Sequence, residues 1–409
     1  MTYRIAIIGV TGYAGKYLET LRALIRNQRI RITAAVVINP DEAASELQFL
    51  RQIGTTVYSD YQEMLASQAA NIDLCIIPTG IAWHKRMTVE ALSHGLNVLV
   101  EKPIAATLQD VRDMAEAEKA SSGFVAVGFQ DIYQSSVQNL KQQILNGVIG
   151  KPVHIKSKCL WPRRSSYFLR NDWAGRLHNG NDLVLDSPAN NAMAHFINLN
   201  LFLCGSNFAS SSRVAELSAE IYRVQKIQSF DMFCFKARLA SGVKLSFWGS
   251  HSNHQLIEPE IIIEGDQGTA SWNSLGEVII KGSTQSSSKV GAWDENEHDG
   301  RLAMLEAVLR RIHDPKQFVC TIDLAKEHTR LVNALHDYFP IVELDHRHLT
   351  KNQDDDDSMV EIRGLHHDLS SGFQRNKMFS ELGLEWSQGT ETISLHDYDH
   401  FKGRLIPCS

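Results

Sequence analysis

A glycine-spaced turn near the start of the chain constrains the fold more than any other feature. The sequence GVTGYAG, residues 9–15, separates the apolar run Ile5–Ile8 from the amphipathic stretch Gly15–Asn27. Glycines at three-residue spacing allow a tight turn with positive φ, let the backbone approach a pyrophosphate, and expose amide donors at the positive end of a helix. A dinucleotide is therefore expected to bind this strand–turn–helix unit through Gly9, Thr11, Gly12, Tyr13, Ala14 and Gly15.

Short β-branched runs alternate with amphipathic stretches throughout residues 1–128. The expected strands are Ile5–Ile8, Ile32–Ile38, Thr56–Tyr58, Leu74–Ile77, Val98–Val100 and Val125–Val127. The expected helices have apolar residues at three- and four-residue spacing, and they are Gly15–Asn27, Tyr61–Ala69, His84–His94 and Leu108–Ala120. This rhythm is typical of βα units, so we predict an α/β fold whose N-terminal domain, residues 1–128, is a doubly wound parallel Rossmann sheet.

The pattern changes after Gly128. Alternation of apolar and polar residues dominates residues 212–282 and predicts a mainly antiparallel sheet. The expected strands in that range are Ala215–Arg223, Phe230–Leu239, Val243–Trp248, Glu260–Glu264 and Glu277–Ile280, and an extended run, Val153–Cys159, precedes them. The expected helices are Ser136–Leu145, Arg301–Ile312 and Leu324–Tyr338. Residues 129–340 are therefore predicted to form a second, α+β domain for substrate binding and oligomerisation.

The remaining residues, 341–409, are more polar, and they are predicted to be a C-terminal extension that wraps the body or mediates assembly. Its acidic run, Asp354–Asp357, is interpreted as a solvated loop, because four consecutive acids cannot all face one ion.

Charge and cysteine usage exclude several classes of function. The net charge of −6 is spread over interspersed acids and bases, so no basic stripe for nucleic acid is present. The six cysteines show no C-x-x-C pair, which argues against a disulfide framework or a metal site. No signal-peptide pattern and no apolar run of membrane-spanning length is seen, so we expect a cytoplasmic protein without a membrane partner.

The end of the second strand bears on the choice of cofactor. The acid that usually holds the adenosine ribose is replaced there by Asn39, which is followed by Pro40, Asp41 and Glu42. An amide can still bond a ribose hydroxyl, whereas neighbouring acids receive a 2′-phosphate poorly. NAD is therefore favoured as the cofactor, with NADP left open.

A lysine follows the fifth strand, in the sequence Glu101-Lys102-Pro103, at the carboxyl edge where open α/β sheets bind ligands. Combined with the glycine turn and with Pro78, Thr79 and His84 after the fourth strand, this segment resembles the Gfo/Idh/MocA family, named for glucose-fructose oxidoreductase, inositol 2-dehydrogenase and a rhizopine-catabolism protein. The resemblance implies that Lys102 polarises the reacting hydroxyl, that Glu101 supports the lysine, and that Pro103 fixes the turn.

The same resemblance implies further features. It adds Pro78, Thr79, His84, Glu101 and Lys102 to the cofactor-binding set, together with Asn39 at the ribose. It also implies that the second domain has a large open, mainly antiparallel sheet, and that the protein is a homo-oligomer assembled through this sheet.

The family has an Asp, a His and a second Asp at three-residue spacings near the nicotinamide, and here residues 186–198 depart from that pattern. In one register Asp186 and Asn190 take the Asp and His positions; in the other Asn191, His195 and Asn198 do. We prefer His195 as the general base, because Asn191, His195 and Asn198 share one face of a helix and a histidine accepts protons near neutral pH. Asp186, Asn190 and Asn191 would orient the reacting groups. The alternative is that His195 is a packed helix residue.

The segment 161–176 is dense in Trp, Arg, Tyr and Asn, which suits recognition of a polyol. Aromatic faces pack on sugar C–H groups, while guanidinium and amide groups bond hydroxyls or a carboxylate. The candidate substrate residues are Tyr167, Arg170, Asn171 and Trp173. Alternatively, Arg163 and Arg176 bind acids of the C-terminal extension.

These observations predict an NAD(P)-dependent oxidoreductase that transfers hydride between nicotinamide and a secondary alcohol of a sugar, sugar acid or cyclitol. Two alternatives remain. The Asn residues at motif positions suggest a non-catalytic dinucleotide-binding sensor or scaffold. The glycine turn also resembles that of acyl-phosphate and semialdehyde reductases, which need a reactive cysteine, and Cys75 and Cys159 lie in apolar strands.

Overall fold

The computed structural model describes residues 2–282, 288–290, 300–354 and 357–404. The chain divides into two compact units, which are described separately. The first comprises residues 1–105, 109–134 and 299–326, and the second comprises residues 106–108, 135–298 and 327–409.

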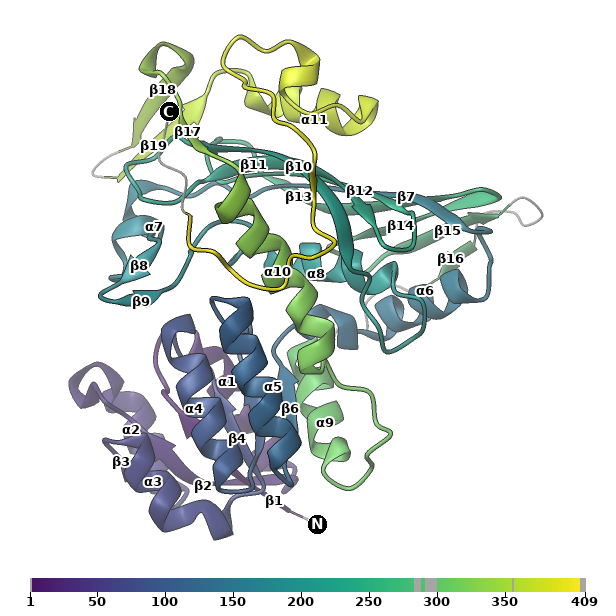
Figure 1. Ribbon diagram of the computed structural model, residues 1–409. Helices are drawn as coiled ribbons and strands as arrows, with labels where there is room; N and C mark the ends of the chain where they lie inside the picture. Colours follow the sequence, from purple (N-terminus) through teal and green to yellow (C-terminus); the bar gives the residue numbers. More distant parts are fainter. Residues whose placement is uncertain (1, 283–287, 291–299, 355–356, 405–409) are drawn as a thin grey trace. The chain divides into compact units, whose positions relative to one another are not determined.

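The first unit is built on a six-stranded parallel sheet with the order β3-β2-β1-β4-β5-β6 (Figure 1). The strands are β1 (Tyr3–Ile8), β2 (Ile30–Val36), β3 (Thr56–Tyr58), β4 (Leu74–Ile77), β5 (Asn97–Val100) and β6 (Val125–Val127). The helices are α1 (Ala14–Arg26), α2 (Ala44–Gln52), α3 (Tyr61–Gln68), α4 (Ile81–Ser93), α5 (Leu108–Ala120) and α9 (Arg301–Arg311). The predicted doubly wound Rossmann sheet is confirmed, and its strand order reverses between β1 and β4, the position where such sheets bind ligands.

The sequence explains why these elements form. All four residues of β4 are buried, as expected of a strand covered on both faces of a parallel sheet. Helix α1 buries Tyr17, Leu18, Leu21 and Leu24, whose spacing of three and four residues makes one apolar stripe. The helix α2 was not predicted, because it follows a short 3₁₀ turn that begins at Pro40 and has a narrow apolar face.

The second unit contains a large mixed sheet, in which most neighbouring strands are antiparallel. Along it the order is β16-β15-β14-β13-β7-β12-β11-β10-β17, and β20 also pairs with β10. The bounds are β7 (Pro152–Leu160), β10 (Val214–Arg223), β11 (Met232–Leu239), β12 (Lys244–Ser250), β13 (Ile257–Gly265), β14 (Gly268–Asn273), β15 (Val278–Gly282), β16 (Ser288–Val290), β17 (Ile341–Glu343) and β20 (Ile393–Ser394). The predicted α+β architecture with a large, mainly antiparallel sheet is confirmed.

Different helices cover the two faces of this sheet. On one face lies α8 (Ala194–Leu203), where Asn200 and Ser157 of β7 are hydrogen-bonded at 2.8–2.9 Å. On the other face lies α11 (Leu365–Arg375) (Figure 1). Its Phe373 packs edge-on against Trp248 of β12. The unit also contains α6 (Ser135–Leu145), α7 (Ser165–Leu169) and the larger part of α10 (Ile322–Tyr338). Two small hairpins complete it, β8 (His178–Asn179) with β9 (Asp182–Leu183) and β18 (Leu349–Asp354) with β19 (Asp357–Ile362).

The C-terminal extension packs on the second unit, where it supplies β17 through β20 and α11. Buried apolar residues of the extension, including Leu365, Leu369 and Phe379, form one cluster with residues of β10, β11 and β12. Of the acidic run, Asp354 and Asp357 pair with each other in the β18–β19 hairpin, and Asp355 and Asp356 lie outside the described residues.

Candidate active site and cofactor site

The glycine turn adopts the backbone that its sequence requires. Gly9 and Gly12 have φ values of +92° and +59°, which residues with a Cβ rarely adopt. The Gly9 N–H donates to the Val36 carbonyl at 2.9 Å and so ties the turn to β2. At the N-cap of α1, Tyr13 makes no side-chain capping hydrogen bond. An uncapped helix N-terminus beside an open, left-handed turn fits the pyrophosphate of a dinucleotide.

Glu101 holds the segment that follows β5. Its side chain is buried, and its carboxylate accepts hydrogen bonds from the Tyr17 hydroxyl at 2.7 Å and from the Lys102 N–H at 2.8 Å. Burial raises the pKa of Glu101, against the opposing effects of Lys102 and Tyr17. Glu101 thus braces the backbone of Lys102 from inside the unit.

Lys102 lies close to the glycine turn within the first unit. Its Nζ is 5.9 Å from the centroid of the Tyr13 ring, and the peptide bond between Lys102 and Pro103 is cis. The structure therefore brings together two features, the glycine turn and the lysine, that are far apart in the sequence.

His84 connects the loops that follow β4 and β5. Its ring is buried, with Nδ1 2.9 Å from the Pro103 carbonyl and Nε2 3.0 Å from the Thr79 carbonyl. Burial lowers the pKa of His84, against the opposing effect of the hydrogen bonds to the Thr79 and Pro103 carbonyls. The adjacent Pro78 is buried too. His84 therefore positions the loops that carry Thr79 and Lys102.

Two other residues border this region. Asn39 is exposed beyond the end of β2, with its amide 3.5 Å from the Glu42 carboxylate. Arg301, at the start of α9, is 6% exposed and donates to the Tyr13 hydroxyl at 3.2 Å. Arg301 was missed by sequence reasoning, because it lies 288 residues from Tyr13 and carries no local motif.

The second unit holds the other candidate catalytic residues. Asp186 is buried, and its carboxylate accepts hydrogen bonds from the Gly175 N–H at 2.6 Å and from the Asn191 amide at 3.0 Å. The Asn190 amide donates to the carbonyls of Val184 and Leu185, both at 3.1 Å. Asp186 and Asn191 are thus paired, whereas the Asn190 amide bonds to backbone carbonyls.

The helix that contains His195 begins later than the prediction requires. His195 is partly buried in the first turn of α8, but Asn191 precedes the helix. The amides of Asn190 and Ala194 bond three residues back, to Ser187 and Asn191, so the chain makes tight turns before α8 begins. Lys102 belongs to the first unit and His195 to the second.

The predicted substrate segment forms a loop around α7 in the same unit. Arg170 stacks on Tyr167, with its guanidinium carbon 3.6 Å from the ring centroid, and lies 5.5 Å from the ring centroid of Trp173. The fourth candidate, Asn171, accepts hydrogen bonds from the N–H groups of Trp173 and Ala174 at 3.2 and 2.8 Å. The Asn171 oxygen therefore shapes the loop, while Tyr167, Arg170 and Trp173 form a stack.

The β18–β19 hairpin holds α7 in place. Asp357 accepts hydrogen bonds from the Ser166 N–H at 3.0 Å and from the Ser166 hydroxyl at 2.5 Å. Ser165 bonds to Ser358, with 2.8 Å between the hydroxyls. The C-terminal extension thus anchors the candidate substrate loop, a role that no local sequence signal indicates.

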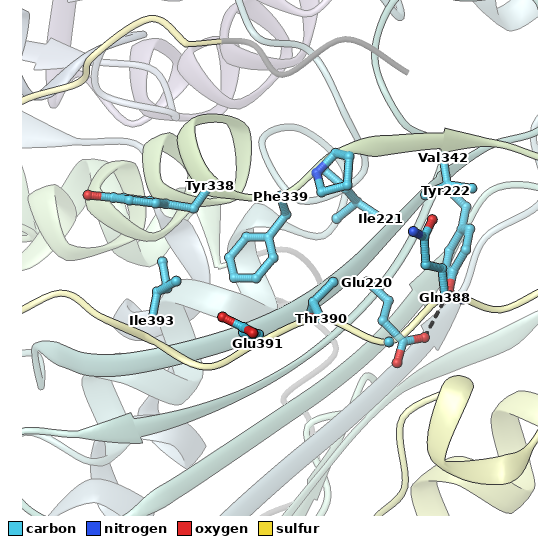
Figure 2. A pocket seen from close by; sticks show the side chains of 12 residues that line it. Glu220, Ile221, Tyr222, Tyr338, Phe339, Val342, Gln388, Thr390, Glu391 and Ile393 are labelled. Atoms are coloured by element: carbon cyan, nitrogen blue, oxygen red, sulfur yellow. Dashed lines mark hydrogen bonds between the residues drawn. The ribbon is translucent and has the colours of Figure 1, made fainter. Parts of the chain in front are cut away.

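A separate pocket of about 300 Å³ lies beside β10, away from these residues. Figure 2 shows its lining, in which the Tyr222 hydroxyl donates to the buried Glu220 carboxylate at 2.9 Å. Glu220 also accepts a hydrogen bond from the Ser380 hydroxyl at 2.5 Å, so its carboxylate has a structural role. The lining residues are Glu220, Ile221, Tyr222, Tyr338, Phe339, Pro340, Val342, Gln388, Gly389, Thr390, Glu391 and Ile393.

Thiol and metal chemistry have little support in the described residues. The five cysteines that the structure describes are buried and free, and burial raises the pKa of Cys75 to about 12. The described residues contain no group of three or more His, Cys, Asp or Glu side chains placed to hold a metal. Within the same residues, no helix combines the length and the apolar character needed to cross a membrane.

Two family models match the chain, one in each part. Residues 3–129 match the model described as an oxidoreductase family with an NAD-binding Rossmann fold, and residues 137–271 match the GFO/IDH/MocA C-terminal domain. Fold and site thus define an oxidoreductase with an NAD-binding Rossmann unit. The chain belongs to the GFO/IDH/MocA family.

Relatives with assigned names match part of the chain. An uncharacterized oxidoreductase of Streptococcus pneumoniae is 33% identical over 140 residues, which are 34% of this chain and 36% of the relative. The inositol 2-dehydrogenase of Serratia proteamaculans is 29% identical over 154 residues, which are 37% of this chain and 44% of that enzyme. The matching segments thus span less than half the length of these two relatives.

Solved structures show the same fold over most of the chain. Levoglucosan dehydrogenase in complex with NADH has a TM-score of 0.68 and 17% identity, and the match covers 82% of this chain and 96% of that one. The WlbA dehydrogenase of Bordetella pertussis, in complex with NADH and UDP-GlcNAcA, has a TM-score of 0.66 and 16% identity, with 82% and 95% covered.

Proposed function

We propose that this protein transfers hydride between NAD and a secondary alcohol of a sugar, sugar acid or cyclitol. The observation that carries the proposal is Lys102, whose backbone is braced by the buried Glu101 beside the glycine turn. The names of the relatives support this reaction class, because inositol 2-dehydrogenase and levoglucosan dehydrogenase act on a cyclitol and a sugar derivative.

The residues of the first unit would hold the cofactor. The backbone of residues 9–15 would receive the pyrophosphate, and Asn39 would bond the adenosine ribose. The acids after Asn39 favour NAD over NADP, since they would repel a 2′-phosphate. Pro78 and Thr79, positioned by His84, would border the nicotinamide side. When bound, NAD supplies the hydride acceptor.

Lys102 and His195 would have separate roles, Lys102 in charge stabilisation and His195 in proton transfer. Lys102 would donate a hydrogen bond to the reacting oxygen and stabilise negative charge on it. His195 would take the hydroxyl proton as general base. Asp186, held by the Gly175 N–H and the Asn191 amide, would place a carboxylate in the same segment, and Asn190 would fix the backbone there.

The sheet of the second unit has an exposed part that bears on assembly. We propose that the chain forms a homo-oligomer through the part of the sheet that α11 leaves uncovered, strands β13–β15. Leu275 and Ile279 are 62% and 37% exposed there. Light scattering after chromatography should show more than one copy, and Ile279→Glu should shift the protein toward the monomer.

The reaction is tested by a panel of sugars, uronates and inositols, each incubated with NAD while the absorbance of NADH is recorded. At least one neutral or acidic polyol should give steady NADH formation. Tight NAD binding without turnover across the panel would instead support a dinucleotide-binding sensor. A thioester reductase is disfavoured because the five described cysteines are buried, whereas loss of turnover on thiol alkylation with NAD binding retained would support it.

A further inference from the structure

Five side chains of the loop around α7 alternate between aromatic rings and guanidinium groups. Arg163 lies between Trp161 and Tyr167, with its guanidinium carbon 6.0 and 4.9 Å from the two ring centroids. Arg170 continues the series between Tyr167 and Trp173, at 3.6 and 5.5 Å. We call the set Trp161, Arg163, Tyr167, Arg170 and Trp173 the arginine ladder.

The guanidinium groups of the ladder have no acidic partner among the described residues. The hydrogen bond that Arg163 makes there runs from Nη1 to the Pro162 carbonyl at 3.0 Å, and its buried Nε has no partner. The neighbouring carboxylate of Glu258 accepts from the Trp161 indole N–H at 3.3 Å instead. The Arg163 side chain is partly buried without a carboxylate, which is costly because its charge is removed from water without compensation, whereas Arg170 is exposed.

A neutral histidine lies beside the ladder. His251 is 2% exposed, its ring is 5.9 Å from Tyr167, and its Nδ1–H donates to the Trp161 carbonyl at 2.7 Å. Burial and the two arginines lower the pKa of His251 to about 3. The positive charge of this region therefore belongs to Arg163 and Arg170.

The ladder is connected to the proposed general base within the second unit. Trp161 packs edge-on against Phe196, the residue after His195, with ring centroids 5.3 Å apart. At the other end of the loop, the Gly175 N–H donates to Asp186. A substrate placed at His195 would therefore have the aromatic and guanidinium groups of the ladder along its remaining atoms.

We propose that the arginine ladder binds an anionic group of the substrate, a carboxylate or a phosphate, so that the substrate is an acidic sugar rather than a neutral polyol. The inference rests on the proposed function, because it takes the substrate to lie beside His195. The planar guanidinium groups of Arg163 and Arg170 match the paired oxygens of such an anion, while Trp161 and Tyr167 pack on the sugar ring.

Binding is measured by titration calorimetry on the NAD-saturated protein, with glucuronate, galacturonate, glucose 6-phosphate and the neutral sugars glucose and galactose. At least one acidic sugar should bind about tenfold or more tightly than its neutral parent. The acidic sugar that binds more tightly then identifies the recognised group as a carboxylate or a phosphate. A neutral parent that binds as tightly, or the absence of binding by all three acids, overturns the inference.

Substitutions of the two arginines test whether they produce the preference for the acidic sugar. Arg163→Gln and Arg170→Gln should each lower the affinity for the acidic sugar by about tenfold and leave the affinity for the neutral sugar within twofold. Arg163→Lys should keep part of the preference for the acidic sugar. Arg176→Gln is the control, because Arg176 is an exposed arginine of the same loop. A preference that persists in the double glutamine variant overturns the assignment. Binding without NADH formation would contradict only the proposed function, whereas NADH formation from neutral sugars without acid preference would contradict only this inference.

Discussion

The Tyr17 hydroxyl donates to the buried carboxylate of Glu101 at 2.7 Å, and Glu101 in turn accepts the Lys102 N–H. Tyr17 belongs to α1, directly after the glycine turn, whereas Glu101 follows β5. Helix α1 and the lysine segment are therefore joined by one hydrogen-bonded pair inside the first unit.

Tyr17→Phe removes this hydrogen bond and leaves a buried carboxylate short of a donor. We expect the free energy of unfolding to fall by about 1–3 kcal/mol, and kcat to fall more than the affinity for NAD. Denaturant unfolding and steady-state kinetics measure the two effects. Tyr58→Phe is the control, since the Tyr58 hydroxyl accepts bonds from Ser67 and Gln68 nearer the surface. Equal stability of the two variants would argue against the brace.

His195→Ala tests the general base. Loss of a positioned base lowers kcat by about 100-fold or more and removes its ionisation from the pH profile. The comparison with His195→Asn, which keeps a polar side chain, separates packing from proton transfer. A pH profile that matches the wild type would transfer the role to Asp186 and Asn190.

Asp357→Ala releases α7 from the β18–β19 hairpin. The Michaelis constant for the substrate should rise several-fold while kcat stays close to the wild-type value, because the loop is loosened but the proposed reacting groups are unchanged. Asp397→Ala is a matched control, since Asp397 is an exposed acid of the same extension that contacts His396. If both variants behave alike, the hairpin has no role in substrate binding.

The buried Lys141 predicts a pH dependence of stability. Its ammonium donates to the carbonyl of Phe202 in the last turn of α8 and to those of Gly205 and Ser210 beyond the helix, and burial lowers its pKa to about 8. The unfolded chain binds this proton up to pH 10.5, the ordinary pKa, so the folded state gains stability as the pH rises from about 8 to 10.5.

Unfolding free energies at several pH values check this prediction. Relative to Lys141→Met, the wild type should gain on the order of 3 kcal/mol across the window. Parallel pH curves for the two proteins would contradict the shifted pKa of Lys141.

The sequence alone predicted most elements of the fold, for physical reasons that differ between the two units. Strands β3, β4 and β6 have the predicted bounds, because short apolar runs between turn residues are typical of buried parallel strands. The strand β14 was missed, since its residues Gly268–Asn273, apart from Trp272, are small or polar and directly follow a turn.

The site was only partly predictable, because its parts are held together by contacts between distant residues. The glycine turn and the lysine segment have local sequence patterns, and both could be found. The pairs Tyr17 with Glu101 and Ser166 with Asp357 lie 84 and 191 residues apart, and a single sequence contains no signal for such pairing. The start of α8 at Ala194 was also missed, because residue spacing alone does not show where a helix begins.

Lys102→Met tests the central claim most directly, because methionine keeps the length of the side chain but cannot donate to the reacting oxygen. With the best substrate of the panel, kcat should fall by about 100-fold or more, while the dissociation constant of NAD stays within about twofold. Lys85→Met, at a half-buried lysine of α4 that pairs with Asp110, should leave both values unchanged. An unchanged kcat in Lys102→Met would contradict the assigned active site.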